Sequence, residues 1–468
     1  MKQQRLRSSL LTLTKRMRNA LLRSPLWSLT CIGPLLIVNS SGVLAQPKLE
    51  DSVRTEFLHA WHGYKQYAWG HDALNPLSRK PHDWYGTSLC MTPVDAYDGM
   101  LLMGLRQEAE EVKQLILDSL SFKKNIEVQS FEITIRLLGG LLTAYQLNGD
   151  KRFILLAEDL GKRLLPVFET STGMPYRYVN LETGRIRDSL NNPAEIGTSL
   201  IEFGTLSKLT GNSIYYKKAK QALIALFARR SRIGLVGSWI NVQTGEWVDK
   251  SSHIGGGIDS YYEYLLKAWL LFGDEDCRKM WDQSMKAINA FVADTSHGGI
   301  WYGQVDMDSG VRTGTEFGSL EAFFPALLVL SGDKKRAEEL EASCFKMWRL
   351  YDIEPEEIDY SSMKVTATSY YLRPEIIESA YYLYRATGDQ KYRQMGEVFF
   401  GNIVKYCRTD AGYAMLKDVT TKEKSDRMES FFFAETLKYL FLLFSPPETL
   451  QFDKVVFNTE AHPIRRTW

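Results

Sequence analysis

Acidic residues recur inside stretches of this sequence that are otherwise apolar. Glu132 stands within the run Phe-Glu-Ile-Thr-Ile-Arg-Leu-Leu, Asp259 precedes Ser-Tyr-Tyr, and Glu435 follows Phe-Phe-Phe-Ala. A carboxylate buried among apolar side chains needs a hydrogen-bonding partner, a proton or a metal ion. Because carboxyl groups with perturbed pKa values gather at functional sites, we expect these acids to converge on one pocket.

Further acids stand near the starts of other helix-like stretches. They are Glu195, Glu263, Glu316, Glu321, Glu375, Glu378 and Glu429. The alternative interpretation is that an acid in the first turn of a helix interacts favourably with the helix dipole. That interpretation accounts for acids at helix starts. It does not account for acids that recur within apolar helices.

A pocket rich in carboxylates and aromatic rings suits a carbohydrate ligand. Carboxylates accept hydrogen bonds from sugar hydroxyls, and aromatic rings cover the apolar face of a sugar. Two carboxyl groups on either side of a glycosidic bond can hydrolyse it as acid and base. An oxygen-rich site can also hold a hard cation such as calcium. These residue types predict a glycosidase, and they do not name its substrate.

The elements that would position these acids are helices that end at a repeated signal. The helix-like stretches stop at Gly149, Gly211, Gly273, Gly332 and Gly388, which recur every 56 to 62 residues and are each followed by Asp or Asn. Glycine adopts the left-handed conformation that ends a helix, and Asp or Asn caps the next helix. The repeat therefore predicts helical hairpins in series.

Seven such hairpins fit the sequence. The apolar, inner helices are expected near 94–104, 129–147, 193–210, 257–272, 315–330, 373–387 and 428–444. The amphipathic, outer helices are expected near 106–120, 152–167, 214–229, 275–292, 334–349 and 390–406, with 51–69 closing the ring. Turn-rich segments at 180–184, 241–245 and 306–310 predict short β-hairpins between repeats.

The hairpin count predicts an all-α fold, an (α/α)7 barrel or toroid of seven helical hairpins. An open solenoid is the alternative arrangement of such repeats. Closure is favoured because neither end of the sequence carries a polar capping repeat.

Composition and charge exclude several classes of protein. The 468 residues are 44% hydrophobic, which permits a full core, and their formal net charge of +1 lacks the basic excess of a nucleic-acid binder. The five cysteines include no CxxC pair, so neither a disulfide framework nor a zinc site is expected.

The first 45 residues have the composition of a targeting segment. They hold seven basic residues and no acid, and they include the apolar run Leu26–Val38. Val43 and Ala45 occupy the −3 and −1 positions of a signal cleavage site. We predict a signal peptide over 1–45 and a single glycosidase domain over 46–468.

The predicted location is outside the cell or in a periplasm. An uncleaved membrane anchor is the alternative, although Pro34 and the polar residues after it leave few apolar residues for a span. The chain after the signal has no Asn-x-Ser/Thr sequon, which favours a bacterial export route. We expect a monomer.

Several segments together resemble the class I α-1,2-mannosidases of glycoside hydrolase family 47. They are Tyr64–Gly70, Phe131–Gly140, Asp259–Lys267, Leu372–Glu375, Met428–Phe431, Ala434–Tyr439 and Phe457–Pro463. The resemblance implies an inverting, calcium-dependent exo-glycosidase, bacterial in type, that removes terminal α-1,2-linked mannose from mannosides or high-mannose glycans. The family fold is an (α/α)7 barrel, in agreement with the hairpin count.

The resemblance also implies roles for individual residues. Glu132 matches the general acid, Glu375 the base that activates water, and Asp259 a third catalytic carboxylate that has also been considered as the acid. Thr459 matches the Ca²⁺ ligand, which binds through its hydroxyl and carbonyl oxygens while waters and sugar hydroxyls complete the shell. The matches for sugar or calcium-water contacts are Arg136, Glu195, Glu378, Phe431, Glu435 and Glu460.

The sequence departs from the family pattern at three places. Gly257 replaces an arginine that contacts the sugar beyond the cleaved bond in many members, and Ser319 replaces a histidine. Ala322 stands where the family has a disulfide partner for Cys344. The run from Ser319 to Phe323 is closer to the mannosidase-like proteins that act in glycoprotein degradation. These changes affect the expected branch preference more than the chemistry.

Two other functions are compatible with the sequence. The first is a mannose-binding, lectin-like protein, or a mannosidase-like protein of glycoprotein degradation, with little turnover. The second is another α/α-toroid glycosidase, such as one with six hairpins. In each case the expected partner is a mannose-containing or other oligosaccharide rather than a nucleic acid.

Overall fold

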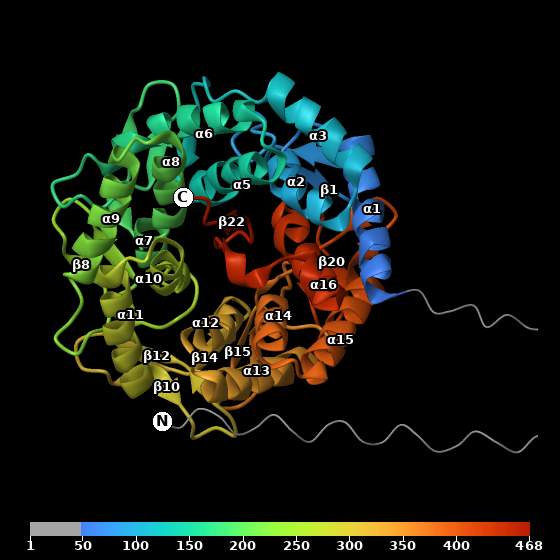
Figure 1. Cartoon of the computed structure of the whole chain (residues 1–468). Helices are drawn as coiled ribbons and strands as arrows, with labels where there is room; N and C mark the ends of the chain where they lie inside the picture. The colour runs from blue at the N-terminus through green and yellow to red at the C-terminus, as the bar shows by residue number, and fades with distance from the viewer. Residues whose placement is uncertain (1–47) are drawn as a thin grey trace, which may run out of the picture. The chain divides into compact units, whose positions relative to one another are not determined.

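The computed structural model describes residues 48–468, which fall within one compact unit and form a ring of helices in two layers (Figure 1). The predicted signal peptide lies outside the described residues. Within residues 48–468, every helix is too short or too polar to traverse a lipid bilayer.

The inner layer of residues 48–468 contains seven helical segments, each mostly apolar and buried. They are α2 (Met91–Met103), α4 (Ser130–Ile133) with α5 (Gly139–Asn148), α7 (Pro193–Gly197) with α8 (Leu200–Thr210), α10 (Asp259–Phe272), α12 (Phe324–Ser331), α14 (Glu375–Thr387) and α16 (Leu437–Phe444). In α16 every residue is buried. A helix that is apolar on all sides must be enclosed by other elements, as these are.

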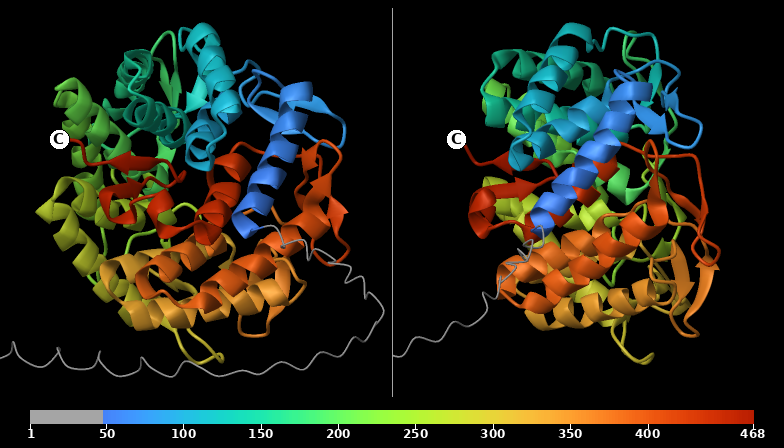
Figure 2. Two further views of the ribbon diagram at one scale, coloured as in Figure 1. Left: turned by 45° about the vertical axis from the view of Figure 1, so that its right-hand side comes forward. Right: turned by 90° about the vertical axis from the view of Figure 1, so that its right-hand side faces the viewer.

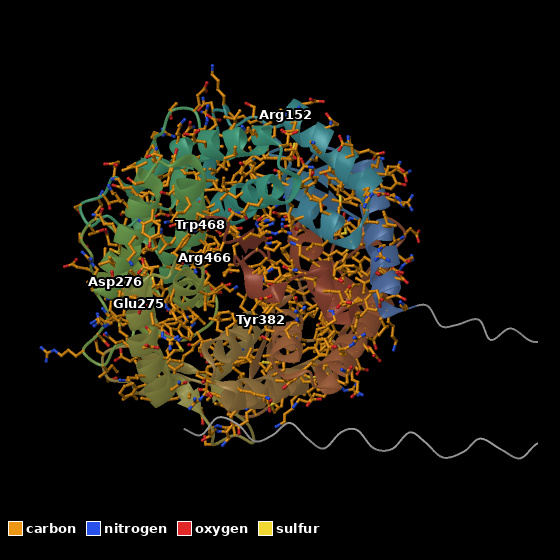
Figure 3. The ribbon with its side chains drawn as sticks, viewed as in Figure 1. Arg152, Glu275, Asp276, Tyr382, Arg466 and Trp468 are labelled. Atoms are coloured by element: carbon orange, nitrogen blue, oxygen red, sulfur yellow. The ribbon has the colours of Figure 1, made fainter. Side chains whose placement is uncertain are left out.

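The outer layer contains seven amphipathic helices within the same residues. They are α1 (Leu49–Tyr67), α3 (Arg106–Ser119), α6 (Lys151–Leu164), α9 (Ile214–Phe227), α11 (Glu275–Ala287), α13 (Lys334–Arg349) and α15 (Gln390–Cys407). Figure 3 shows Arg152, Glu275 and Asp276 on the outer edge of the ring, whereas Tyr382 of α14 lies toward its centre. Helix α1 packs against α16, so the ring closes between the two ends of the unit. The predicted (α/α)7 barrel is confirmed.

The glycine stops have the predicted conformation. Gly149, Gly211, Gly273, Gly332 and Gly388 follow inner helices with φ between +69° and +96°. The next residue in four of the five stops is an Asp whose side chain accepts a backbone N–H of the following helix. Each of these four stops therefore ends one helix and begins the next within two residues.

The predicted turns also form β-hairpins. Asn180, Asn241 and Asp306 each accept two backbone N–H groups of their own turn through one side-chain oxygen. The glycine that closes each turn has φ near +70° to +76°. A strand from an adjoining repeat extends each hairpin into a three-stranded antiparallel sheet.

The strands of residues 48–468 are short and all pair antiparallel. They are β1 (Ala73–Asn75), β2 (Lys80–His82), β3 (Glu127–Gln129), β4 (Tyr178–Asn180), β5 (Ile186–Arg187), β6 (Leu190–Asn191), β7 (Trp239–Asn241), β8 (Trp247–Asp249), β9 (Ser251–Ser252), β10 (Ala293–Asp294), β11 (Trp301–Tyr302), β12 (Gln304–Asp306), β13 (Arg312–Gly314), β14 (Glu316–Gly318), β15 (Glu357–Asp359), β16 (Lys364–Ala367), β17 (Arg408–Thr409), β18 (Gly412–Tyr413), β19 (Leu416–Asp418), β20 (Glu423–Lys424), β21 (Val455–Phe457) and β22 (Pro463–Arg465).

Two inner helices begin later than predicted. The helix expected at 315–330 starts at Leu320, because the residues before it form β14 and Phe317 pairs with Ile358 of β15. Glu316 therefore lies in a strand, and its expected place in a first helical turn is wrong. The helix expected at 428–444 starts about one turn late.

The C-terminal hairpin of β21 and β22 lies inside the ring (Figures 1 and 2). Its strands pack against α5 and α10 of the inner layer. At its tip, the Asn458 side-chain oxygen accepts the N–H groups of Glu460 and His462, and Ala461 adopts a positive φ of 56°. This tight turn fixes the direction of the residues between them.

Candidate active site

A cavity of about 460 Å³ opens within the ring, and the first turns of several inner helices form its wall together with the tip of the C-terminal hairpin. Glu263 lines this cavity, whereas Glu316, Glu321 and Glu429 do not. All ten residues to which the family resemblance gave roles line it. They are Glu132, Arg136, Glu195, Asp259, Glu375, Glu378, Phe431, Glu435, Thr459 and Glu460.

Arg136 connects an inner helix to the tip of the C-terminal hairpin. It lies in a π-helical turn over Thr134–Leu138, and its Nε donates to Glu132 Oε2 at 2.9 Å while Nη1 donates to Glu460. The guanidinium lies over the rings of Trp84 and Phe431, 5.1 and 5.8 Å from their centroids. Glu132 is therefore charge-paired, and its position is tied to the hairpin tip. A π-helical turn at a functional site is common.

A buried charge network lies beneath Arg136. His462 Nδ1 is 2.6 Å from Asp98 Oδ2, and its Nε2 is 3.3 Å from Asp95 Oδ1. Lys438 donates to the Ala461 carbonyl at 2.8 Å and pairs with Asp98. Burial alone would lower the pKa of His462, but the two aspartates outweigh it and raise that pKa to about 9. His462 thus anchors the hairpin tip to α2 as a buried cation.

Glu375 is the first residue of α14 and has an oxygen without a partner. Its Oε2 is buried and accepts no hydrogen bond from the described residues, while Arg373 Nη1 lies 4.0 Å from Oε1. Burial raises the pKa of Glu375 to about 8, although Arg373 opposes this shift. Glu356 holds Arg373 in place through a 3.2 Å bond to Nε. Such a carboxyl group can exchange a proton near neutral pH.

Asp259 begins α10 and contacts no cation directly. Its Oδ1 accepts the backbone N–H of Ser260 at 2.7 Å. Loss of water contact raises the pKa of Asp259 to about 7, and the nearby charge of Glu263 adds to the shift. The electrostatic surroundings of Asp259 and Glu132 therefore differ, since only Glu132 is paired with an arginine.

Further carboxyl groups line the cavity close to Glu375. Glu378 accepts the Tyr439 hydroxyl at 3.2 Å and lies 3.8 Å from Lys267, which also pairs with Glu263. Burial raises the pKa of Glu378 to about 7. Burial and the charge of Glu460 raise the pKa of Glu435 well above its ordinary value. These groups repel one another in the absence of a cation.

Glu195 is held by three polar side chains that the sequence did not single out. Its carboxylate accepts bonds from Gln129 Nε2 at 2.8 Å, Arg177 Nε at 3.0 Å and Asn192 Nδ2 at 3.0 Å. Asn192 also caps α7 by accepting the Glu195 N–H. All three donors line the cavity.

Thr459 lies at the hairpin tip among oxygen atoms. Its backbone N–H donates to the Tyr264 hydroxyl at 3.3 Å, and its own hydroxyl has no hydrogen-bond partner among the described residues. No set of three or more His, Cys, Asp and Glu side chains within residues 48–468 is placed to hold a metal ion by itself. A cation here would take oxygens from Thr459, water and ligand hydroxyls. Calcium accepts such a shell of six to eight oxygens.

The glycines of α5 allow the hairpin tip to approach closely. A Cβ added at Gly139 would stand 2.5 Å from Asn458 Nδ2, which donates to the Ile135 carbonyl and to Glu202 at 2.8 and 2.9 Å. We expect Gly139→Ala to lower the free energy of unfolding by about 1–3 kcal/mol, because the added methyl group overpacks this contact.

The matched control for that variant is Gly401→Ala. Gly401 lies within α15, and a Cβ there would meet nothing within 4 Å. Alanine should therefore stabilise that helix by about 0.5–1 kcal/mol. Urea unfolding followed by circular dichroism measures both variants. Equal effects of the two substitutions would contradict a tight contact at Gly139.

The three family departures lie at or near the cavity. Gly257 lines it with φ of +86°, facing Asn192. Ser319 is buried and donates to Glu356 at 3.1 Å, so it supports the carboxylate that holds Arg373. Cys344 is free and buried.

The chain matches known proteins over nearly all of the described residues. The family model described as glycosyl hydrolase family 47 matches residues 56–466. "Alpha-mannosidase I MNS4" of Arabidopsis thaliana is 39% identical over 449 residues, which are 90% of this chain and 71% of that protein. "Mannosyl-oligosaccharide 1,2-alpha-mannosidase IB" of Homo sapiens is 37% identical over 445 residues, which are 88% of this chain and 69% of that protein.

A solved structure supports the same relationship. The alpha-1,2-mannosidase from Trichoderma reesei superposes with a TM-score of 0.83 at 29% identity, over 90% of this chain and 99% of that one. These similar proteins come from a plant, human and a fungus, so the prediction of a bacterial-type member is not borne out. With its fold, its carboxyl-lined cavity and its match over 56–466, the chain belongs to glycosyl hydrolase family 47 and is a glycoside hydrolase.

Proposed function

We propose that this enzyme hydrolyses terminal α-1,2-linked mannose from mannose-containing oligosaccharides, inverting the anomeric carbon and using a bound Ca²⁺. The observation that carries the proposal is the unpartnered oxygen of Glu375 in a cavity that Glu132 and Asp259 also line. Those groups supply a base and an acid for one glycosidic bond. The α-1,2-mannosidase names of the similar proteins support the substrate class.

The chain's own residues can bind and orient the sugar. Phe431 offers an aromatic face beside Arg136, and the carboxylates of Glu378 and Glu435 accept sugar hydroxyls. Glu375 takes the proton of a water that attacks the anomeric carbon from the face opposite the leaving group. Inversion requires room for that water, so the two catalytic carboxyl groups should be about 6.5–9.5 Å apart.

Asp259 is the better donor of the proton to the leaving oxygen. Asp259 accepts a backbone N–H and contacts no cation directly, so it can hold a proton, whereas Glu132 already accepts a charged bond from Arg136. A general acid works best when its pKa lies near the working pH. We therefore assign the acid role to Asp259 and a positioning role to Glu132, reversing the order that the family resemblance implies.

Thr459 is the residue that would hold the calcium ion, through its hydroxyl and carbonyl oxygens. When bound, the ion fixes sugar hydroxyls and polarises a nearby water. The carboxyl groups of Glu435 and Glu460, which line the same cavity, would orient the ion's water ligands.

Calcium should stabilise the enzyme more at pH 8 than at pH 5.5. The pKa values of Glu375 and Glu378 are raised to about 8 and about 7 from 4.5. Protonation of these groups favours the folded state. Without a cation, the contribution of these two groups to the free energy of unfolding is fully present below about pH 4.5. It is lost as pH rises through 7 and 8. Ca²⁺ compensates for the charges that then appear.

Thermal unfolding with EDTA and with Ca²⁺ measures this effect. At 100 times its dissociation constant, Ca²⁺ should add about 2.7 kcal/mol to the free energy of unfolding. Mg²⁺ is the control, because it demands an octahedral shell and sheds water reluctantly. The proposed site would be contradicted if Ca²⁺ raised the free energy of unfolding at pH 5.5 by as much as at pH 8 or more. It would also be contradicted if Mg²⁺ produced the same increase as Ca²⁺.

Proton NMR of α-1,2-mannobiose hydrolysis tests the whole proposal. We expect β-mannose as the first product, no turnover in EDTA and recovery with Ca²⁺. Initial α-mannose would exclude inversion. Binding of mannobiose without turnover at full calcium loading would favour the lectin-like alternative.

A further inference from the structure

A stack of alternating arginines and aromatic rings runs along the edge of the cavity. We call Arg187, Tyr178, Arg177 and Trp239 the rim stack. The Arg187 guanidinium lies 4.2 Å from the centroid of Tyr178, and Arg177 lies 5.5 Å from Tyr178 and 5.3 Å from Trp239. Tyr178 begins β4 and Trp239 begins β7, so the stack joins the hairpins of two neighbouring repeats.

The rim stack leads from the cavity wall at Arg177 to the protein surface at Arg187. Side-chain exposure rises from 2% at Glu460 and 6% at Glu195 to 25% at Arg177 and 54% at Arg187. Arg177 belongs to both regions, because it lines the cavity and pairs with Glu195 at 2.9 Å. A chain of sugars leaving the cavity on this side would pass over the stack.

The charges of the rim stack are already compensated. Glu195 neutralises Arg177, and Glu127 pairs with Arg187 at 2.7 Å. A phosphate or carboxylate ligand would therefore meet no net positive charge. A neutral ligand with many hydroxyl groups suits these paired arginines better.

Trp239 keeps a free hydrogen-bond donor on the rim stack. Its ring is half-buried, and its indole N–H makes no hydrogen bond to the described residues. By contrast, the indoles of Trp84, Trp247 and Trp269 donate to protein oxygens. An aromatic face with a free N–H beside it can cover the apolar side of a pyranose and bind one hydroxyl.

The wall between cavity and rim stack is open on one side. Gly257 lines the cavity near Asn192 and carries no side chain, whereas the Leu320 side chain fills the space beside Gly256. A sugar residue beyond the cleaved bond can therefore reach Arg177 without displacing a side chain at position 257.

We propose that the rim stack binds the sugar residues of the substrate that remain outside the cavity on the leaving-group side, an inference that rests on the proposed function. Trp239 covers one pyranose face, and its N–H and the Arg177 guanidinium donate to hydroxyls. The enzyme thus prefers α-1,2-linked oligomannosides over the disaccharide.

The test compares kcat/KM for α-1,2-linked mannobiose, mannotriose and mannotetraose. We expect kcat/KM of the wild type to rise with substrate length. Trp239→Ala should lower the ratio of kcat/KM for mannotetraose to kcat/KM for mannobiose about tenfold, through a change in KM. Trp239→Phe should keep part of the gain, since it retains the ring and loses the N–H. Titration calorimetry in the Glu375→Gln background should show the same loss of affinity without turnover.

Trp269→Ala is the matched control. Trp269 is also half-buried and stacks with an arginine, Arg278 at 4.4 Å, but it lies near the end of α10 away from the cavity. The Trp269→Ala variant should leave the dependence of kcat/KM on substrate length unchanged. No gain with length in the wild type, or an equal loss at every length in Trp239→Ala, would overturn the inference while leaving mannobiose hydrolysis intact. No hydrolysis at any length would instead refute the proposed function.

Discussion

Replacing Glu375 by Gln should lower kcat on α-1,2-mannobiose by about 10²–10⁴-fold, the range expected for loss of a general base. The glutamine has nearly the same shape but cannot take a proton from water. Substrate affinity should be kept or improved, because one of the mutually repelling carboxyl groups near Glu378 and Glu435 is removed. Initial rates and titration calorimetry measure the two effects separately.

Glu341→Gln provides a matched control for this substitution. Glu341 on α13 is fully buried, neither of its oxygens has a partner among the described residues, and it does not line the cavity. Its pKa is raised well above the ordinary value by burial, and the substitution again replaces a buried carboxyl group by an amide of nearly the same shape. If Glu341→Gln lost as much activity, or Glu375→Gln kept full turnover, Glu375 would not be the base.

The helical ring was predictable because its signals are local. A glycine followed by Asp ends one helix and starts another, whatever surrounds it, and this pattern marks the stops at Gly149 and Gly388. Gly104 also ends an inner helix with φ of +74°, but Leu105 follows it and no such pair marks the place. The start of the helix after β14 was mispredicted because pairing with β15, a distant strand, overrides the local preference.

The acids of the site were predictable for a similar reason. An acid within an apolar helix is visible in the sequence, and Glu132, Asp259 and Glu435 are of this kind. The same signal marks Lys267 in α10 and Lys438 in α16, which are also charged residues in buried helices. These lysines pair with carboxylates at the cavity and beneath it.

The hydrogen-bond partners of Glu195 that are distant in the sequence could not be predicted. Gln129 and Arg177 become hydrogen-bond partners of Glu195 only because the fold brings them together in space. Their residue types are common on protein surfaces, and their spacing carries no period. The family resemblance also did not reach them, since it was carried by helix and hairpin motifs.

The proton donor can be identified by changing the leaving group. For mannobiose, the departing oxygen must be protonated, so Asp259→Asn should lower kcat by about 10²–10⁴-fold. For α-mannosyl fluoride, the fluoride ion departs without a proton, so the same variant should lose much less activity. Glu132→Gln should instead lower both rates by similar factors, since it disturbs Arg136 and through it Glu460.

The ratio of the two rates separates chemistry from structural damage. A misplaced cavity affects both substrates alike, whereas loss of the acid affects only the one with the poor leaving group. The alkaline limb of the pH profile gives a second measure, because the pKa of about 7 at Asp259 belongs to the group that must be protonated. Removing that group should flatten the fall of kcat at high pH. If Glu132→Gln is instead the variant that keeps its rate on α-mannosyl fluoride while it loses its rate on mannobiose, the proton comes from Glu132. Arg136 must then release that carboxyl group when substrate binds.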